Sequence, residues 1–291
     1  MRSWSPGSFV TGYLECAWMA EHPAVFECEP GHSPLIISMP HVGTELPEAL
    51  LPLLSDAGRS VVDTDWYVDR LWAFALHSGA GWVRARYSRY LIDLNRPPDD
   101  HSLYPGQTTT PLCPTETFAG ESIYVGAGPD AAEISRRREL YWRPYHEALQ
   151  ALIKQRIQQH GFAVLVDAHS ILSSVPRLFP GRLPDINVGT YGGRSLGRTA
   201  ERKVIAVLEC QSRFTHVLNG RFQGGYITRA YGQPAQRVHA IQFEIAQCAY
   251  MDERTGVCSA ASMAPLQALL EQVPEALMAV GREDLMRPQL A

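Results

Sequence analysis

Short, nearly continuous apolar runs alternate along the chain with stretches whose apolar residues recur at helical spacing. The runs predict buried strands at residues 34–40, 82–95, 162–170 and 239–246, with a possible strand at 186–190. Segments 9–15 and 23–29 are possible short edge strands. This alternation predicts one α/β domain over residues 1–291, in which a mixed, mostly parallel sheet of about eight strands carries helices on both faces.

The helices are predicted from apolar periodicity together with caps and breakers. They begin at Pro47, cover Asp63–His77, extend from a cap at Asp130 to about His160 with a bend at Pro144, and recur at Thr199–Leu208 and Pro265–Gly281. Two stretches, 97–128 and 171–195, are rich in loop-forming residues and show no clear periodicity. Long excursions of this kind are often functional.

Composition restricts the function classes. Of 291 residues 45% are apolar and 19% are charged, and 26 Lys and Arg against 30 Asp and Glu give a net charge of −4. No block of like charge suggests nucleic acid or a membrane surface as a partner. The six cysteines form no C-x-x-C pair, and no apolar stretch is long enough to span a membrane. We therefore expect a cytoplasmic protein with reduced thiols.

Chemically versatile side chains accompany the ends of the predicted strands. His41 follows the first strand, the second ends in Asp93–Arg96, the third ends in Asp167–Ser170, and Glu244 lies near the end of the last. In open α/β sheets, ligands bind at the carboxyl ends of the strands, so these groups are expected to meet at one edge. The chain has neither a G-x-G-x-x-G following a strand nor a G-x-x-x-x-G-K-[ST], which argues against a nucleotide cofactor.

Two imidazoles and one carboxylate are the usual protein ligands of a catalytic zinc ion. His41 and His169 are the predicted histidine ligands of one divalent metal ion, with zinc preferred. The third ligand is either Glu45, four residues after His41, or Asp65, at the start of the next predicted helix. Structural or surface roles are assigned to three further histidines, His101, His146 and His216.

Five segments together resemble the N-formylglutamate amidohydrolase (N-formylglutamate deformylase) family. They are SMPHVGTELP at 38–47, DTDWYVDRLW at 63–72, SRYLIDLNRPPDD at 88–100, VDAHS at 166–170, and NGRFQGGYITRAYGQP through HAIQFEIAQCAYMDE at 219–253. The resemblance extends over most of the chain. It implies a fold similar to that of zinc carboxypeptidases, which is a phosphorylase/hydrolase-like fold.

The similarity to zinc carboxypeptidases implies roles residue by residue. Those enzymes bind zinc through His-x-x-Glu and a later histidine, use Asp-x-Asn-Arg for a supporting aspartate and a carboxylate-binding pair, and employ a late glutamate as general base. The matching residues, in type and in order, are His41, Asp93, Asn95, Arg96, His169 and Glu244. Position 44 holds Thr44 instead of the second ligand, so the resemblance favours Asp65 over Glu45 as the third ligand.

The resemblance implies hydrolysis of N-formyl-L-glutamate to L-glutamate and formate, a terminal step of histidine degradation. Arg96 with Asn95 is expected to bind one carboxylate of this small dianionic substrate, and Arg221 or Arg229 the other. One alternative is a related metal-dependent amidase or carboxypeptidase that acts on another N-acyl amino acid or a short peptide. A second alternative is a catalytically silent carboxylate-binding protein on the same scaffold, which the complete set of metal-binding groups disfavours.

Overall fold

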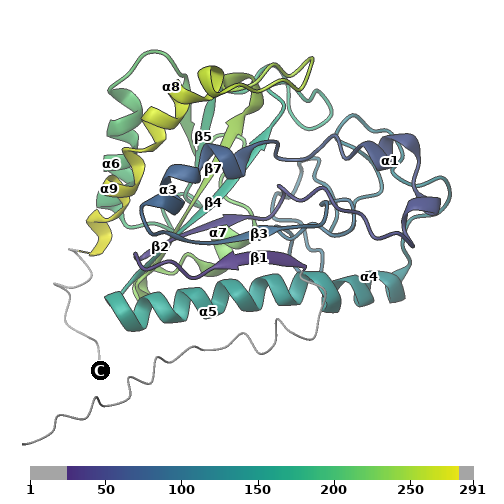
Figure 1. Cartoon of the computed structure of the whole chain (residues 1–291), viewed down its shortest axis with the longest axis horizontal. Helices are drawn as coiled ribbons and strands as arrows, with labels where there is room; N and C mark the ends of the chain where they lie inside the picture. Colours follow the sequence, from purple (N-terminus) through teal and green to yellow (C-terminus); the bar gives the residue numbers. More distant parts are fainter. Residues whose placement is uncertain (1–24, 282–291) are drawn as a thin grey trace, which may run out of the picture.

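A twisted sheet forms the centre of the computed structural model, which describes residues 25–281. In chain order its strands are β1 (Phe26–Glu29), β2 (Leu35–Met39), β3 (Gly81–Ala85), β4 (Ala163–Ile171), β5 (Ile186–Gly189), β6 (His216–Leu218) and β7 (Val238–Ala246). They lie in the order β1-β3-β2-β4-β7-β5-β6 (Figure 1). The pairs β1–β3 and β5–β7 are antiparallel and the other four pairs are parallel, so the predicted mixed, mostly parallel sheet is confirmed.

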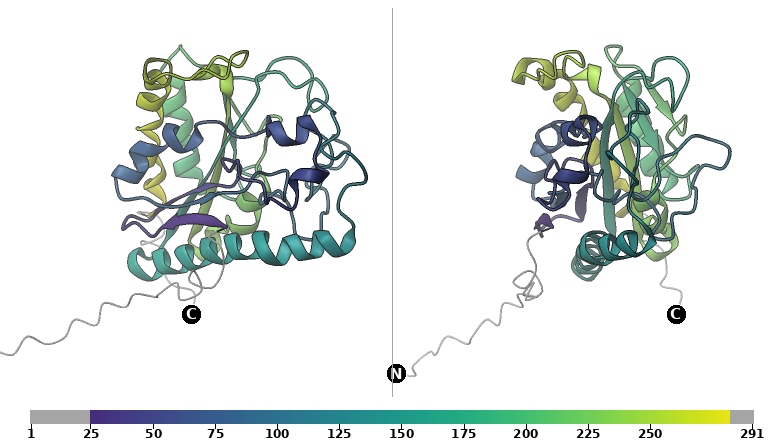
Figure 2. Two further views of the ribbon diagram at one scale, coloured as in Figure 1. Left: turned by 45° about the vertical axis from the view of Figure 1, so that its right-hand side comes forward. Right: turned by 90° about the vertical axis from the view of Figure 1, so that its right-hand side faces the viewer.

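Helices cover both faces of the sheet. They are α1 (Asp56–Ser60), α2 (Val68–Leu71), α3 (Ala73–His77), α4 (Ala131–Arg137), α5 (Arg143–His160), α6 (Arg198–Glu209), α7 (Tyr226–Tyr231), α8 (Ala260–Leu270) and α9 (Val273–Leu277). Buried residues of α2, α3, α6, α8 and α9 belong to the core on one face, and those of α5 and α7 to the core on the other. In the right-hand view of Figure 2, α2 and α3 lie together on one side of the strands. No helix within residues 25–281 is long and apolar enough to cross a bilayer.

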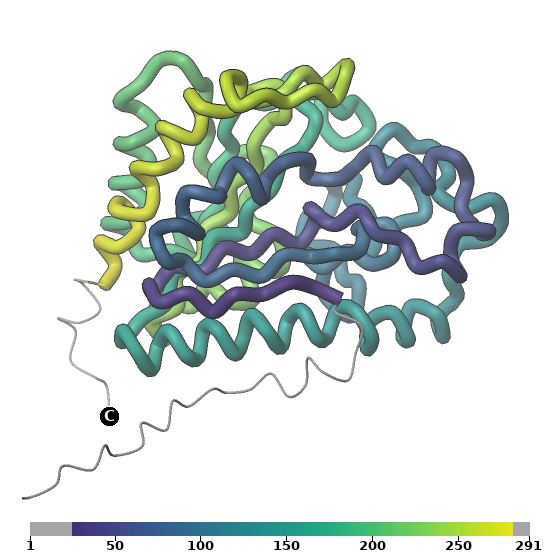
Figure 3. Tube along the Cα trace, in the orientation of Figure 1, coloured from purple at the N-terminus to yellow at the C-terminus, as the bar shows by residue number. Residues whose placement is uncertain are grey.

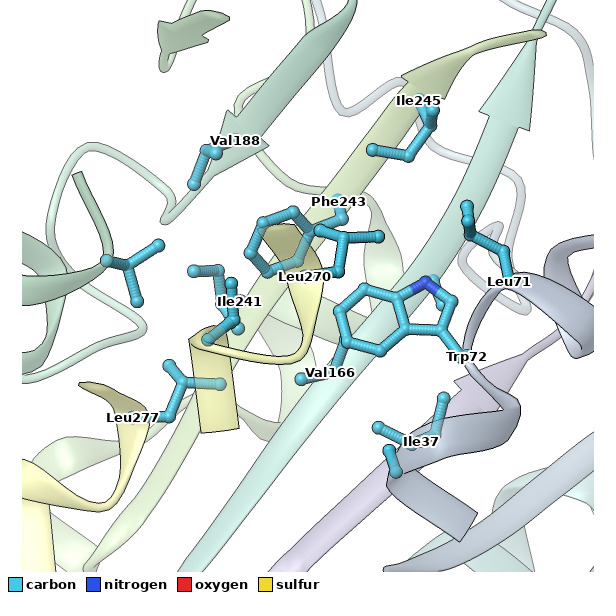
Figure 4. Packing of buried hydrophobic residues seen from close by; sticks show 14 of the residues in the cluster. Ile37, Leu71, Trp72, Val166, Val188, Ile241, Phe243, Ile245, Leu270 and Leu277 are labelled. Carbon is cyan, nitrogen blue, oxygen red and sulfur yellow. The ribbon is translucent and has the colours of Figure 1, made fainter. Parts of the chain in front are cut away.

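The two cores follow from the alternation of side chains along the strands. In β2, Ile37 and Met39 pack on the side of α2 and α8, whereas Ile36 packs on the side of α5. Trp72, completely buried between α2 and α3, lies 5.4 Å from Phe243 of β7 between ring centroids, and Figure 4 shows it among the apolar side chains of that face. Burial on both faces explains why the central strands are nearly continuous apolar runs in the sequence.

The predicted strand at 82–95 is wrong beyond Ala85. Strand β3 ends at Ala85, and residues 86–95 continue as turns and irregular chain. Tyr90, Leu91, Ile92 and Leu94 are all buried in the core on the side of α5, which is why the segment looks like a strand in the sequence. The apolar residues of this segment are therefore due to the burial of a loop and not to pairing in the sheet.

Three of the predicted helices differ in extent. The segment after Pro47 forms only turns before a 3-10 turn at Leu51–Leu53 and the short helix α1. The predicted helix at Asp63–His77 starts later, because Tyr67 adopts a left-handed backbone conformation (φ 61°) and α2 follows it. At the C-terminal end, α8 and α9 replace a single helix at Pro265–Gly281.

The other helix and strand predictions agree with the structure. Asp130 caps α4 by accepting the amide N–H of Glu133, Gly161 ends α5 in a left-handed conformation, and α6 lies at the predicted place. The strands at 186–190 and 23–29 are present as β5 and β1, whereas segment 9–15 lies outside the described residues. Neither β6 nor α7 is predicted from the sequence.

The long helix predicted at 130–160 contains a π-helical turn, Arg138–Trp142, between α4 and α5. This turn ends just before Pro144, where the sequence predicts a bend. Proline has no amide N–H, so the carbonyl of Leu140 lacks its usual helical partner. The turn places the first residues of α5 beside the loop that follows β3.

The excursion at 97–128 has no helix or strand, as predicted, and its ordered contacts within the described chain include an isolated bridge between Glu116 and Ser122. In Figure 3 the blue to blue-green trace of this region lies at the right, beyond the ends of β2 and β3. The excursion therefore covers the edge of the sheet at which the sequence predicts the site.

Candidate active site

The site lies on the same face of the sheet as α5, at a part of the strands that α5 does not cover. On this face β4 presents Ala163 and Leu165 and then changes to Asp167 and His169, while β7 changes from Val238 and Ala240 to Gln242 and Glu244. The register pairs Asp167 with Gln242 and His169 with Glu244, so both strands become polar at the same level. Asp167 and His169 thus lie within β4, in agreement with the strand predicted at 162–170.

His41, Asp65 and His169 form a compact buried cluster. One potential ligand atom from each lies within 4.8 Å of those of the other two. Oδ2 of Asp65 is 2.9 Å from Nδ1 of His169 and 3.6 Å from Nδ1 of His41. The amide N–H of Asp65 also donates to the carbonyl oxygen of His41 at 3.0 Å, which fixes the Asp65 turn against the end of β2. Both Nδ1 atoms therefore face the same carboxylate.

The opposite ring nitrogens contact other carboxylates. Nε2 of His41 lies 2.7 Å from Oδ1 of Asp93, and Nε2 of His169 lies 3.0 Å from Oδ1 of Asp167. Asn95 Nδ2 is 2.9 Å from Nε2 of His169 and donates to Oδ2 of Asp167 at 3.0 Å. Metal-binding histidines commonly use their second nitrogen in this way, which orients the ring.

Glu45, the alternative third ligand, lies elsewhere. Its carboxylate binds the guanidinium of Arg86 at 2.8 Å and is about half exposed. It is not part of the buried cluster of His41, Asp65 and His169. The geometry therefore favours Asp65, which lies within the DTDW segment at 63–66.

Buried charges of both signs balance each other in the site. Burial raises the pKa of Asp65, but the charge of His41 and the hydrogen bond with His169 outweigh it and hold that pKa below its ordinary value. Burial likewise opposes ionisation of Asp93, yet His41 and Arg89 keep its pKa well below the usual range. Burial lowers the pKa of His169, and the charges of Asp167 and Asp65 raise it well above its ordinary value in the absence of a cation. The chain thus favours positive charge at this place.

Glu244 lies beside the cluster on β7. Its side chain is almost completely buried, and Oε2 accepts a hydrogen bond from Gln242 Nε2 at 3.2 Å. Burial raises its pKa to about 8, even though the nearby His169 lowers it. A buried carboxyl group with such a pKa exchanges a proton near neutral pH, which is the property of a general base or acid.

A small cavity of about 70 Å³ opens onto this face. It is lined by residues of β4 and β7, of the excursion, and of the segments that follow β2, β3, β4 and β6: His41, Arg89, Asn95, Arg96, Tyr104, Thr108, Thr109, Thr110, Phe118, His169, Ser170, Ile171, Leu178, Arg221, Phe222, Gly225, Gln242 and Glu244. The guanidinium of Arg96 donates to the carbonyl and hydroxyl oxygens of Thr110, and that of Arg221 donates to the carbonyl of Thr108. Both arginines therefore join the excursion to the cavity wall.

Arg229 is placed differently from the other predicted arginines and is not among the lining residues. Its Nε donates to the carbonyl of Gly224 and its NH1 to that of Leu103, each at 2.8 Å. The guanidinium also lies 4.5 Å from the ring centroid of Tyr104, whose hydroxyl donates to Gly224. Arg229 thus holds the part of the excursion that carries Tyr104 into the cavity.

Arg89 contributes to the site although sequence reasoning gives it no role. It is buried, its NH2 donates to Oδ2 of Asp93 at 2.6 Å, and its NH1 lies 3.9 Å from Oδ1 of Asp65. Its Nε has no hydrogen-bond partner among the described residues, and the side chain lines the cavity. Its position four residues before Asp93 is a weak signal, because the intervening chain is not the regular strand that the pattern suggests.

A serine in a G-x-S-x-G sequence at 193–197 lies outside the cavity. Ser195 is completely buried, and its hydroxyl donates to the carbonyl of Ala240 at 2.8 Å. The nucleophilic serine of an α/β hydrolase is exposed at a strand-to-helix turn, so Ser195 does not fill that role.

The fold and the site define an α/β enzyme that suits a small anionic substrate, since buried acid–base groups and three arginines converge on one small cavity. The chain belongs to the N-formylglutamate amidohydrolase family, whose sequence model matches residues 33–251. The resemblance found in the sequence is therefore confirmed.

Individual proteins support this membership. An N-formylglutamate deformylase of Pseudomonas aeruginosa is 46% identical over 255 residues, which are 87% of this chain and 96% of that protein. One of Pseudomonas putida is 45% identical over 259 residues, 88% of this chain and 97% of the other. The crystal structure of an N-formylglutamate amidohydrolase from Ralstonia eutropha matches with a TM-score of 0.76 and 26% identity over 90% of this chain and all of that one. A protein of Agrobacterium tumefaciens, at 20% identity and a TM-score of 0.67, shares the fold over 88% of this chain and 96% of its own.

Proposed function

We propose that the protein hydrolyses N-formyl-L-glutamate to L-glutamate and formate. The observation that carries the proposal is the His41–Asp65–His169 cluster beside Glu244, at a cavity that three arginines line. The names of the two Pseudomonas relatives, which are identical to this chain at 45–46% of positions, support the same substrate. Within this proposal the reaction would serve histidine degradation.

The cluster fits a divalent metal ion, with zinc preferred. Two imidazole nitrogens and a carboxylate oxygen are a zinc donor set. Asp93 behind His41, and Asn95 with the nearby charge of Asp167 behind His169, provide the support that such ligands require. We propose His41, Asp65 and His169 as the ligands of one ion. When bound, such an ion supplies a Lewis acid for the formyl carbonyl and acidifies the attacking water.

Glu244 moves the proton in the proposed reaction. It accepts a proton as the water attacks the formyl carbon, and it returns that proton to the amine nitrogen as the C–N bond breaks. Its place opposite His169 in the β4–β7 ladder holds it rigidly beside the cluster. Asp93 acts indirectly, because it orients His41 and Arg89.

Arginines provide the remaining electrostatic stabilisation. Arg89 lines the cavity, its Nε has no hydrogen-bond partner within residues 25–281, and its charge is suited to the oxyanion that forms at the formyl oxygen. Arg96 and Arg221 lie among the cavity residues and are suited to the two carboxylates of the substrate. Asn95 is engaged with Asp167 and His169, so its proposed contact with substrate is secondary to its role in holding the site.

The proposal is tested by measuring release of the free amino acid from a panel of N-formylglutamate, N-formylaspartate, N-formylglycine, N-acetylglutamate and a short peptide that ends in glutamate, with formate measured in parallel for the N-formyl compounds. N-formylglutamate is expected to give the highest kcat/KM. Preference for N-acetylglutamate or for a short peptide would instead indicate the related amidase or carboxypeptidase. No turnover of any member, with the cluster loaded with zinc, would favour the silent carboxylate-binding protein.

Replacement of Arg96 by alanine separates the two carboxylate sites. Loss of a charge-assisted contact of about 1.5–3 kcal/mol should raise KM for N-formylglutamate by about ten- to 100-fold, with a smaller loss in kcat. If Arg96 binds the α-carboxylate, N-formylglycine is affected equally. If it binds the side-chain carboxylate, N-formylglycine is nearly unaffected and Arg221 becomes the α-carboxylate partner. Unchanged kinetics on both substrates would show that Arg96 only holds Thr110.

Replacement of Arg229 by alanine tests whether this residue acts through the excursion. We expect KM to rise about tenfold for N-formylglutamate and for N-formylglycine alike, because the loss of the Leu103 contact displaces Tyr104 from the cavity wall. Steady-state kinetics on both substrates make the measurement. A loss confined to N-formylglutamate would instead show direct contact between Arg229 and the side-chain carboxylate. Arg194→Ala is the matched control, because this exposed arginine also stacks on a tyrosine, Tyr191, but lies outside the cavity.

A further inference from the structure

The turn that carries Asp93, Asn95 and Arg96 has no strand partner, although it holds several groups of the site. Strand β3 ends at Ala85, and the chain from Arg86 to Arg96 is irregular. A ladder therefore does not fix these side chains, and other contacts must do so, because small displacements of reacting groups reduce rates strongly. The contacts of this turn on the side away from the cavity identify what holds it.

Three successive carbonyl groups of the turn accept hydrogen bonds. The carbonyl of Leu94 lies 2.9 Å from Nε2 of His146, and that of Arg96 accepts the indole N–H of Trp142 at 3.0 Å. Between them, the carbonyl of Asn95 lies 3.5 Å from the amide nitrogen of Tyr226, at the start of α7. The side-chain oxygen of Asn95 also accepts the amide N–H of Ile227 at 2.8 Å.

Trp142 and His146 form one unit. They are four residues apart at the end of the π-helical turn and in the first turn of α5, so they project from the same side. Their rings are stacked, with centroids 3.7 Å apart and an angle of 27° between planes. A helix thus presents two donors to carbonyls two residues apart in the turn, one on each side of Asn95.

The tautomer of His146 follows from its partners. The Leu94 carbonyl can only accept, so Nε2 carries the proton, and Nδ1 accepts from the hydroxyl of Tyr231 at 2.8 Å. His146 is almost completely buried, and burial lowers its pKa to about 3, so it remains neutral over the pH range of an assay. The donor to Leu94 is therefore present throughout.

We propose that Trp142 and His146 are positioning residues of the hydrolysis, which clamp the Leu94–Arg96 main chain so that Asp93 and Asn95 keep both site histidines in place. This inference rests on the proposed function. It explains the π-helical turn, because the turn sets the rotation of α5 at which the rings of Trp142 and His146 reach the carbonyls of Arg96 and Leu94. It also changes the assignment of His146 from a purely structural residue to one that acts on the site through the main chain.

The first test is Trp142→Phe, which removes the indole N–H but keeps an aromatic ring for stacking on His146. We expect kcat/KM for N-formylglutamate to fall about five- to tenfold, the value of one neutral hydrogen bond, mainly through kcat. Trp72→Phe is the control, because Trp72 is fully buried and its Nε1 has no hydrogen-bond partner among the described residues. It should lower the melting temperature at least as much as Trp142→Phe yet leave kcat/KM within about twofold.

A double-mutant cycle distinguishes positioning from general stability. If Trp142 acts through the turn, Trp142→Phe should have less than half its effect in an Asn95→Ala background, expressed as the logarithm of kcat/KM. A further pair compares His146→Leu, which leaves the Leu94 carbonyl unpaired, with His146→Gln, which can donate to it. The glutamine variant should recover most of the kcat that the leucine variant loses.

Two outcomes would overturn the inference. One is a Trp142→Phe variant whose kcat/KM equals that of the active wild-type enzyme. The other is an effect of Trp142→Phe on the logarithm of kcat/KM that is the same with and without Asn95→Ala. Failure of the proposed function is seen separately, because the wild-type protein would then release no formate from N-formylglutamate.

Discussion

Replacement of Glu244 by glutamine is expected to lower kcat for N-formylglutamate by about two to four orders of magnitude, the usual effect of losing a positioned acid–base group. Glutamine keeps the size of the side chain and its contact with Gln242, but it cannot accept the proton of the attacking water. The measurement is formate release under saturating substrate. Because the substitution leaves His41, Asp65 and His169 intact, metal content should be unchanged, and a variant that retains more than a tenth of wild-type kcat would exclude Glu244 as the base.

The pH profile provides a second measurement of the same prediction. Burial raises the pKa of Glu244 from 4.5 to about 8 in the chain without a cation. A base acts only when ionised, so kcat/KM should fall as the pH decreases through this pKa. A cation at the cluster lowers the pKa again, so the acid limb is expected between 4.5 and about 8. The residual activity of Glu244→Gln should lack this limb.

Replacement of His41 or His169 by alanine is expected to remove both bound metal and activity. Each imidazole would supply one of three protein ligands, and loss of a ligand should weaken metal affinity by more than the roughly 10- to 100-fold that loss of an outer partner costs. Metal content by mass spectrometry, expected close to one divalent ion per chain in the wild type, makes the measurement. Full activity of both variants after chelation would rule out a metal-dependent reaction.

Asp65→Ala and Glu45→Ala form a matched pair for the third ligand. Asp65 faces both histidines, whereas Glu45 is about half exposed on Arg86. Asp65→Ala should therefore lose metal, and Glu45→Ala should keep it with near wild-type kinetics, since exposed ion pairs contribute little to stability. The reverse result would transfer the third ligand to Glu45.

The central strands and most of the site can be predicted from the sequence because their residue patterns have one physical cause. Residues 162–170 and 239–246 are mostly apolar since both faces of β4 and β7 are covered, and His169, Gln242 and Glu244 occur where the cavity replaces a helix. Chain order and sheet geometry then suffice to bring His41, His169 and Glu244 together.

Contacts made by irregular segments of the chain could not be predicted from the sequence. The apolar residues of 86–94 predict a strand, but they are buried by packing against α5, and this error hides the position of Arg89. Arg229 looks equivalent to Arg221 in the sequence, and only the path of the excursion decides that it binds Leu103 instead of facing the cavity. Short elements such as β6 and α7 have too few residues for a period to be visible.

The floor and the wall of the cavity differ in how freely they can change during evolution. Asp167, His169 and Glu244 sit in the paired interior of two nine-residue strands, where a substitution or a shift of register would damage the sheet itself. Tyr104 and Thr108–Thr110 come from an excursion without helix or strand, which tolerates substitution and changes of length. New substrate preferences can therefore arise within this family by replacement of wall residues, while the inherited chemistry of the floor is retained.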